Sequence, residues 1–288
     1  MLTDDQIEAY RTNGYIGVEN VLTSSVLEEA RLVVEEFVER SRGVSENDAI
    51  FDLEPEHTPE RPLLRRLKTP AKWHPFFDGL MRSDAILDLV GPLMSPDIRF
   101  QGDKLNMKVA DVGSPIEWHQ DFAHYPHTND DLLAVGVALD DCTLENGCLL
   151  VIPGSHKGPV YDHHQDGVFV GAISPSNVDV DLNKAEPVQV KAGGVTIHHC
   201  RTLHASAPNR SSNPRRLLFY QYTAVDAWPL IGVPDLDEYN RNVVRGEPTL
   251  EFRMNGMANV RVPLPTPGRS GSIFDLHSYV KERAFAGR

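Results

Sequence analysis

The chain has 288 residues, of which 41% are hydrophobic and 24% are charged, and its formal net charge is −13. This composition is typical of a globular protein, and the length allows one large domain with a full core. It excludes a disordered tail, a collagen-like fibre and a disulfide-rich miniprotein. Residues 1–60 carry 15 Asp and Glu against four Arg. Because nucleic-acid binding needs a basic surface, we expect no nucleic-acid partner.

The sequence also lacks the signals of membrane insertion and export. No apolar run in the chain approaches the roughly 18 residues that span a bilayer. The N-terminal stretch MLTDDQIEAY is acidic and has no apolar core of a signal peptide. The three cysteines, Cys142, Cys148 and Cys200, are sparse and odd in number, which is typical of free thiols in a reducing compartment. We therefore expect a cytoplasmic protein without membrane contact.

Residues 1–97 carry mainly helical patterns. In chain order, the sequence predicts a helix over 3–12, a strand over 15–21, a helix from 25, a loop over 41–63 and a helix over 76–94. The first helix opens on a capping box formed by Thr3 and Gln6, and the second on one formed by Ser25 and Glu28.

The pattern changes after residue 97 to short apolar runs separated by Gly and Pro. These runs predict strands over 98–109, 132–139, 148–152, 188–190, 195–199 and 217–225. Helices followed by many short strands favour a β-sandwich or barrel with helices against one side. Residues 226–288 are rich in Pro, Gly and Arg and are predicted to form a lid or a C-terminal tail. We expect a single domain over 1–288, with its β core in 98–225.

The strongest local motif is Trp118-His119-Gln120-Asp121. Residues i and i+2 of a strand project from the same face, so His119 and Asp121 would point together into a barrel. An imidazole and a carboxylate side by side form two thirds of the set of two histidines and one carboxylate that binds Fe(II) with open positions. The motif alone also fits a plain surface or core pair.

A second group of candidate residues begins 85 positions later. His204 follows a predicted strand and is a candidate third metal ligand. Arg215 lies eleven residues further on, where its planar guanidinium suits a carboxylate of a cosubstrate. Ser206 can add a hydroxyl contact to the same group.

Four segments together resemble the phytanoyl-CoA dioxygenase-like family of Fe(II)/2-oxoglutarate oxygenases. They are LTDDQIEAYRTNGYIGVENVL, WHQDFAHYP, ENGCLLVIPGSHKG and HASAPNRSSNPRR, in the family's order, and they extend over most of residues 2–225. The resemblance implies a mainly β fold with flanking helices, built on a double-stranded β-helix (cupin-type jelly roll). It further implies that His119, Asp121 and His204 bind iron and that Arg215, assisted by Ser206, binds the distal carboxylate of 2-oxoglutarate.

The resemblance also suggests further contacts. In some relatives a basic residue upstream of the barrel reaches the cosubstrate, and by spacing Arg65 or Arg66 would take that place, with Lys104 as another candidate. The surrounding basic cluster fits either a solvated face or an anchor for an anion; its members are Arg61, Arg65, Arg66, Lys68 and Lys72. The predicted substrate-contacting residues are His124, Tyr125 and Trp228.

The implied reaction is hydroxylation of an unactivated C–H bond of a small organic molecule, with O2 as cosubstrate and release of succinate and CO2. Related halogenases have a small residue where this chain has Asp121, so halogenation is not expected. Desaturation, ring formation and epimerisation use the same ligands. Two other functions fit the residues: a cupin-like metal enzyme without 2-oxoglutarate, which would not need Arg215, and a binding protein without turnover.

Overall fold

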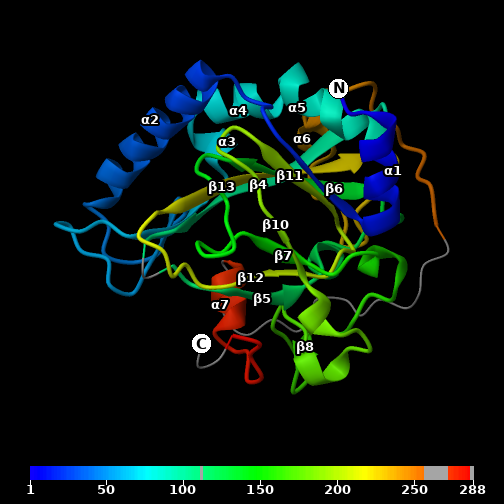
Figure 1. Ribbon diagram of the computed structural model, residues 1–288. Coiled ribbons are helices and arrows are strands. Elements are labelled where there is room, and N and C mark those ends of the chain that lie inside the picture. The colour runs from blue at the N-terminus through cyan, green and yellow to red at the C-terminus, as the bar shows by residue number, and fades with distance from the viewer. Residues whose placement is uncertain (111–112, 256–271, 286–288) are drawn as a thin grey trace.

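Two antiparallel sheets face each other in the computed structural model, which describes residues 1–110, 113–255 and 272–285 (Figure 1). The larger sheet has the order β1 (Tyr15–Val18), β11 (Val195–His199), β6 (Leu132–Ala138), β13 (Arg215–Ala224), β4 (Ile98–Lys108), β3 (Leu64–Lys68), β2 (Phe51–Leu53), with β14 (Val243–Arg245) beside β4. The smaller sheet has the order β10 (Glu186–Val188), β7 (Leu149–Val151), β12 (His204–Ser206), β5 (Ile116–His119). A separate hairpin joins β8 (His164–Gln165) to β9 (Val168–Phe169). The predicted jelly-roll fold is confirmed.

Strand β13 shows how the sequence builds two environments on one sheet. Successive side chains of a strand point to opposite faces. Tyr220 and Tyr222 point toward the helices, where their hydroxyls donate to the carbonyls of Phe77 (2.9 Å) and Met81 (2.7 Å). The alternate residues, Leu217 and Phe219, line the space between the sheets. The face of the larger sheet that meets the helices therefore forms the hydrophobic core, and the opposite face lines the space between the two sheets.

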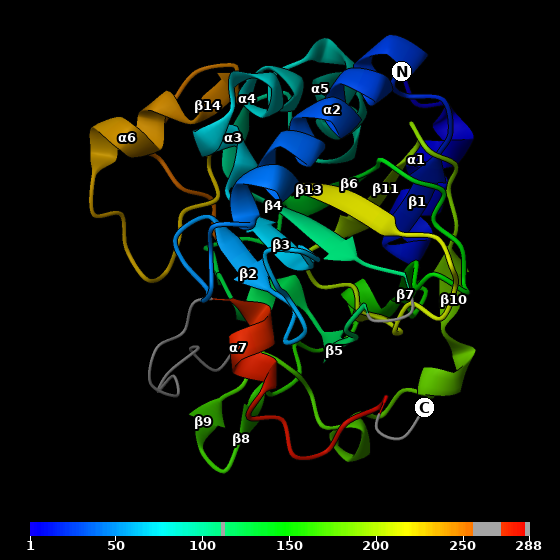
Figure 2. The same cartoon turned by 90° about the vertical axis from the view of Figure 1, so that its left-hand side faces the viewer.

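Helices cover the outer face of the larger sheet (Figure 2). They are α1 (Asp4–Asn13), α2 (Ser24–Ser41), α3 (Pro70–Trp73), α4 (Pro75–Met81) and α5 (Asp84–Val90). Helix α2 buries Ala30, Val34 and Phe37, and the Phe37 ring lies 6.5 Å from that of Phe77 on α4. Burying a side chain of this size contributes about 2–3 kcal/mol, so this helical layer fixes the sheet that carries the site.

The N-terminal capping prediction is confirmed for the first helix and wrong for the second. Thr3 and Gln6 form the expected capping box. Helix α2 instead begins after Thr23, whose hydroxyl accepts the N–H of Val26 at 3.4 Å. Thr23 has the extended backbone of an N-cap residue, and Ser25 is already in the first turn. A run of three hydroxyl residues leaves the choice among them to the tertiary packing of the helix.

Two other predictions in the N-terminal third are corrected. The pattern over 76–94 is broken into α4 and α5, because Ser83 adopts an extended conformation between them and serves as the N-cap of α5. The predicted loop over 41–63 contains β2, which pairs with β3. This short strand exists through pairing with a distant segment, which local sequence patterns do not reveal.

The C-terminal part packs on the barrel in three described pieces. Strand β14 extends the larger sheet beside β4, helix α6 (Leu236–Arg241) precedes it, and helix α7 (Ile273–His277) lies against β5 (Figures 1 and 2). The rest of the predicted lid or tail, over 256–271 and 286–288, is outside the described residues. None of the helices in the described ranges has the length and apolar character needed to cross a bilayer.

Candidate active site

Two side chains of the smaller sheet and one from the turn that follows β5 converge at one point. His119 is the last residue of β5, His204 is the first of β12, and the two are directly paired across neighbouring strands. Asp121 follows in a 3-10 turn over Asp121–Ala123. Their potential ligand atoms all lie within 4.8 Å of one another. The expectation that His119 and Asp121 share a strand face is therefore corrected: the strand ends at His119, and the turn brings the carboxylate back beside it.

Backbone carbonyls orient both imidazoles. The Nδ1 of His119 lies 2.8 Å from the carbonyl of Glu117, and that of His204 lies 2.9 Å from the carbonyl of Thr202. Because a carbonyl only accepts, each Nδ1 carries the proton and each Nε2 keeps its lone pair. Those Nε2 atoms lie 3.8 and 3.9 Å from Oδ1 of Asp121. This donor set of two neutral imidazoles and a carboxylate fits Fe(II) and leaves coordination positions open.

Electrostatics keep the three groups in the protonation states that a metal needs. Burial, reinforced by the neighbouring His198, lowers the pKa of His204 to about 3, and burial and His204 hold the pKa of His119 well below its usual value. Burial opposes ionisation of Asp121, but the hydrogen bond from His198 and the charge of Lys104 outweigh it and hold the pKa of Asp121 well below the usual range. At neutral pH the site therefore presents two free imidazole nitrogens and an anion.

His198 is a site residue that was not predicted from the sequence. It lies on β11 and is buried. Its Nε2 is 3.3 Å from Oδ2 of Asp121, whereas His119 and His204 lie nearer to Oδ1. Its ring lies 4.4 Å from that of His204, and its contact with Oδ2 orients the Asp121 carboxylate. The alternation of side chains along a strand could have identified this histidine, because Thr196 and His198 share the face of β11 that points between the sheets.

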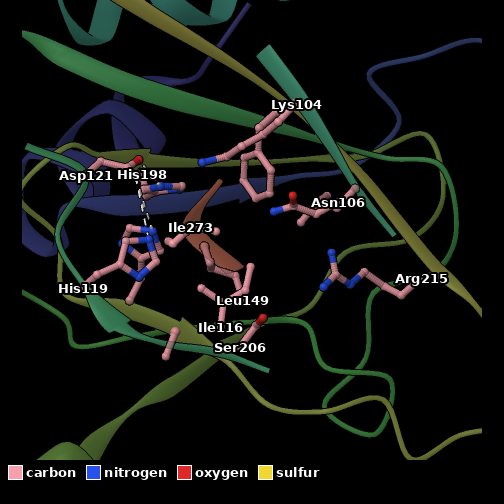
Figure 3. Close-up of a pocket in the computed structure, with 14 residues that line it drawn as sticks. Lys104, Asn106, Ile116, His119, Asp121, Leu149, His198, Ser206, Arg215 and Ile273 are labelled. Carbon is pink, nitrogen blue, oxygen red and sulfur yellow. Dashed lines mark hydrogen bonds and ion pairs between the residues drawn. The ribbon is translucent and has the colours of Figure 1, made fainter. Parts of the chain in front are cut away.

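A pocket extends from these ligands to Arg215 at the start of β13 (Figure 3). Figure 3 shows Asp121 and His119 at one end and the Arg215 guanidinium entering from the other, with Ser206 and Asn106 beside it. Arg215 is 2% exposed, and its Nε and Nη1 have no hydrogen-bond partner among the described residues. The Oγ of Ser206 and the Oδ1 of Asn106 are likewise buried without partners.

Arg215 is the available cation at that end of the pocket. Lys108 is paired with Arg215 in the sheet and is also buried, but its ammonium donates to the carbonyls of Ser114 (2.7 Å) and Ala207 (2.6 Å). Burial lowers the pKa of Arg215, yet a guanidinium stays protonated in proteins. A buried, unpartnered guanidinium is costly without an anion, so the geometry fits a molecule with a carboxylate at one end and a chelating group at the other.

A second cavity opens on the other side of Asp121. It shares Asp121, Lys104 and Ile273 with the first pocket. The predicted substrate residues His124 and Tyr125 both line it. Lys104, which was predicted to contact the cosubstrate, borders both spaces, and its ammonium points toward Asp121 in Figure 3.

Arg66 also lines this second cavity, whereas two predicted residues are not brought to either space. The Nε of Arg65 is 3.1 Å from Oε2 of Glu54, and its guanidinium stacks 4.8 Å from the Phe274 ring centre. Trp228 donates its backbone N–H to Thr128 and lies outside the lining of both cavities. Within the predicted basic cluster, Lys68 pairs with Asp52 at 2.7 Å.

Comparison with known proteins agrees with the geometry. The model of the phytanoyl-CoA dioxygenase family matches residues 10–217. The chain is 38% identical over 267 residues to a probable alpha-ketoglutarate-dependent hypophosphite dioxygenase of Stutzerimonas stutzeri, covering 91% of each chain. It is 26% identical over 224 residues to methylphosphonate hydroxylase of Gimesia maris, covering 78% of this chain and 82% of that protein.

Solved structures share the fold. The structure of EctD from S. alaskensis with bound Fe superposes with a TM-score of 0.66 at 22% identity, covering 88% of each chain. At this identity the likeness establishes the jelly-roll architecture, and the chemistry has to be argued from the side chains of this chain.

Proposed function

Because this chain belongs to the phytanoyl-CoA dioxygenase family and is an iron- and 2-oxoglutarate-dependent dioxygenase, we propose that its two cofactors share the pocket between the sheets. His119, Asp121 and His204 hold Fe(II). Arg215, with Ser206 beside it, binds the distal carboxylate of 2-oxoglutarate. The observation that carries this assignment is a buried ligand triad at one end of the pocket and an unpartnered guanidinium at the other.

The cofactors and the protein have separate tasks in this reaction. When bound, iron and 2-oxoglutarate use O2 to supply the oxidant, and 2-oxoglutarate leaves as succinate and CO2. The chain's residues position the reactants and exclude water. Arg215 fixes one end of the cosubstrate by charge, and the apolar side chains of Ile116, Leu149 and Ile273 line the space between. His198 keeps Asp121 oriented as a ligand.

The substrate is a small oxyanion of phosphorus, in which a P–H or C–H bond becomes P–OH or C–OH. Two relatives support this class: one named for hypophosphite and one for methylphosphonate. The cavity on the substrate side of Asp121 also supports it, because Arg66 and Lys104 both line it. Of the two acids that line the same cavity, Asp121 is a proposed iron ligand and Asp103 accepts the N–H of Ala71 at 2.6 Å. Positive charge in a confined cavity favours an anionic substrate. This proposal replaces the expected C–H bond of a general small organic molecule with a narrower class.

Three buried cysteines without disulfides among the described residues support a reducing compartment for the enzyme. We propose the cytoplasm as that compartment.

The cofactor assignment is tested by an anaerobic titration with Fe(II) and 2-oxoglutarate, followed through the weak visible band of the chelated keto acid. We expect the band in the wild type and its loss in His204→Ala. Removing a charge-assisted bidentate contact costs about 3 kcal/mol, or roughly 100-fold in affinity, so Arg215→Ala needs about 100-fold more 2-oxoglutarate.

Arg216→Ala is the matched control. Its side chain lies on the other face of the sheet, paired with Asp140 at 2.9 Å, so the titration stays as in the wild type. An Arg215→Ala titration that overlays the wild type would refute the cosubstrate assignment, whatever the substrate is.

The substrate class is tested by succinate release with hypophosphite and with methylphosphonate, using L-proline as a neutral-charge comparison. We expect oxyanion-dependent succinate release and a new phosphorus-31 resonance from the oxidised product. Succinate release with L-proline but with neither oxyanion would overturn the substrate class and leave the cofactor assignment intact.

A further inference from the structure

Arg66 is a cation without a counter-ion in the cavity beside the metal ligands. The structure records no hydrogen bond or ion pair for its guanidinium with any described residue, and its Nε is buried without a partner. Its basic neighbours differ: Arg65 pairs with Glu54 at 3.1 Å and Lys68 with Asp52 at 2.7 Å. Of the three basic residues on β3, Arg66 alone has no ion pair with a described residue.

The sheet register explains why Arg66 reaches the cavity. Strand β3 pairs with β4 so that Arg66 lies opposite Asn106, and residues paired in this way share a face. Asn106 lines the cosubstrate pocket, so this face points between the sheets. Arg66 itself borders the second cavity and not the first, whereas Lys104 borders both. The two arginines, Arg66 and Arg215, thus serve different spaces.

Three carboxylates lie near Arg66, and none of them is recorded within ion-pair distance of its guanidinium. Asp52 holds Lys68, Asp103 accepts the N–H of Ala71 at 2.6 Å, and Asp275 caps helix α7 by accepting the N–H of Ser272 at 3.0 Å. Burial lowers the pKa of Arg66, and these acids offset that effect only in part. A desolvated guanidinium that its neighbours do not satisfy favours binding of an external anion.

We propose that Arg66 is the specificity-determining residue for the substrate, binding its oxyanion group in the cavity next to Asp121. This inference rests on the proposed function. The planar guanidinium of Arg66 can donate two parallel hydrogen bonds to two oxygens of a tetrahedral oxyanion. Arg215 binds the carboxylate of the cosubstrate and Arg66 binds the oxyanion of the substrate, so the two anions bind at separate sites in one barrel. Gln221 and Tyr125, which are hydrogen-bonded to each other, line the same cavity as neutral polar partners.

The test compares Arg66→Gln and Arg66→Lys with the matched control Arg65→Gln. We expect Arg66→Gln to raise the KM for hypophosphite or methylphosphonate about 100-fold while the KM for 2-oxoglutarate changes less than about twofold. Arg66→Lys recovers part of the loss, because it restores the charge without the fork. Arg65→Gln leaves both KM values unchanged, since its partner is Glu54.

A second readout does not depend on turnover. Phosphite is titrated calorimetrically into enzyme held anaerobically with Fe(II) and 2-oxoglutarate, and we expect binding to the wild type that Arg66→Gln loses. The keto-acid band is recorded in the same samples and is expected to be identical in both proteins. Because the Arg66→Gln substitution removes a buried uncompensated charge, the variant is expected to fold, and the retained band verifies it.

The outcomes separate the two proposals. If no oxyanion is oxidised but phosphite binding depends on Arg66, the substrate class fails and the anion site stands. If oxyanions are oxidised with an unchanged KM in Arg66→Gln, the substrate class stands and the role of Arg66 is refuted. If Arg66→Gln instead weakens the keto-acid band and raises the KM for 2-oxoglutarate, Arg66 serves the cosubstrate and the inference is wrong. If the wild type binds no phosphite and oxidises no oxyanion, both fail.

Discussion

Gly136 in the middle of β6 illustrates how one missing side chain shapes the site. A Cβ built there would lie 2.6 Å from the Thr196 hydroxyl and 2.9 Å from the ring of Phe219. Phe219 lines the cosubstrate pocket, so Gly136 gives its ring the space to lie against the sheet.

We therefore expect Gly136→Ala to lower the free energy of unfolding by about 1–3 kcal/mol, as overpacking does in tight cores. The displaced Phe219 ring would also narrow the pocket and weaken 2-oxoglutarate binding. Urea unfolding and the keto-acid titration measure the two effects. Gly102→Ala on β4 is the control, because the new Cβ would meet only the Gln221 side chain, at 3.8 Å. An equal effect of both variants would contradict the steric argument.

At the scale of single residues, the sequence predicted the groups that belong to a motif and missed those that depend on the fold. The structure brings together His119, Asp121 and His204 as expected, with Arg215 facing them. Asn106 was missed, although Lys104, Asn106 and Lys108 alternate with apolar residues in one strand and so mark a polar inner face. Ile273 gave no local signal, because it reaches the pocket from a distant C-terminal helix.

Helix α7 packs against β5, the strand that carries the proposed iron ligand His119. His277 on this helix accepts the N–H of Glu117 at 3.3 Å with Nδ1 and donates to the carbonyl of Gly171 at 3.1 Å with Nε2. Glu117 in turn fixes His119 through its own carbonyl. The helix thereby supports His119, the proposed iron ligand, without a direct hydrogen bond to it.

We expect His277→Leu to leave two backbone groups without partners, at about 1–3 kcal/mol each in the free energy of unfolding. Because the support of His119 weakens, metal affinity is expected to fall about 10- to 100-fold. Urea unfolding and metal titration measure the two quantities. Tyr279→Ala, beyond the end of the helix and 51% exposed, is the control; a His277→Leu protein that binds metal like this control would show that α7 does not support the ligand.

Element boundaries were predictable where local sequence decides them. The long strands β4, β6 and β11 match the apolar runs over 98–109, 132–139 and 195–199. The helix predicted over 76–94 failed at Ser83, because its apolar periodicity continues through a residue that also caps a helix. Short strands such as β2 exist only through pairing with a partner, and no local pattern specifies a partner.

At the scale of the whole molecule, the sheet order follows from long-range pairing. Neighbours in the larger sheet include β1 with β11 and β4 with β13, and the strands of each pair are separated by more than 100 residues of the chain. The apolar patterns predicted helices against a β-sandwich or barrel, and the family resemblance implied the double-stranded β-helix; the order of the strands in each sheet was not predicted. The physical reason is that strand register is set by which faces are buried together, and burial depends on all the elements at once.

Buried neutral histidines make the stability of the whole metal-free protein depend on pH. Burial lowers the pKa of His127, His163 and His277 to about 4 each, against about 6.5 in an unfolded chain. As the pH falls below that unfolded value, the unfolded state takes up protons that the folded state refuses. The stabilisation is therefore complete above about pH 6.5 and is lost as the pH falls toward 4, by about 1.4 kcal/mol per pH unit for each histidine.

Asp103 acts in the opposite direction. Burial raises its pKa to about 7, so its protonated form stabilises the folded state at low pH, and this contribution is lost as the pH rises from about 4 to 7. It offsets the contribution of about one of these histidines, so His127, His163, His277 and Asp103 together account for a loss of about 3 kcal/mol per pH unit between pH 6 and 4.5. Other buried histidines, such as His204 with a pKa of about 3, add to this loss. Urea unfolding of the metal-free protein at pH 7.5, 6 and 5 measures this slope. Asp103→Asn removes the offset and should steepen the measured slope by about 1.4 kcal/mol per pH unit. A free energy of unfolding that stays constant from pH 7.5 to 5 would mean that these histidines become protonated in the folded protein.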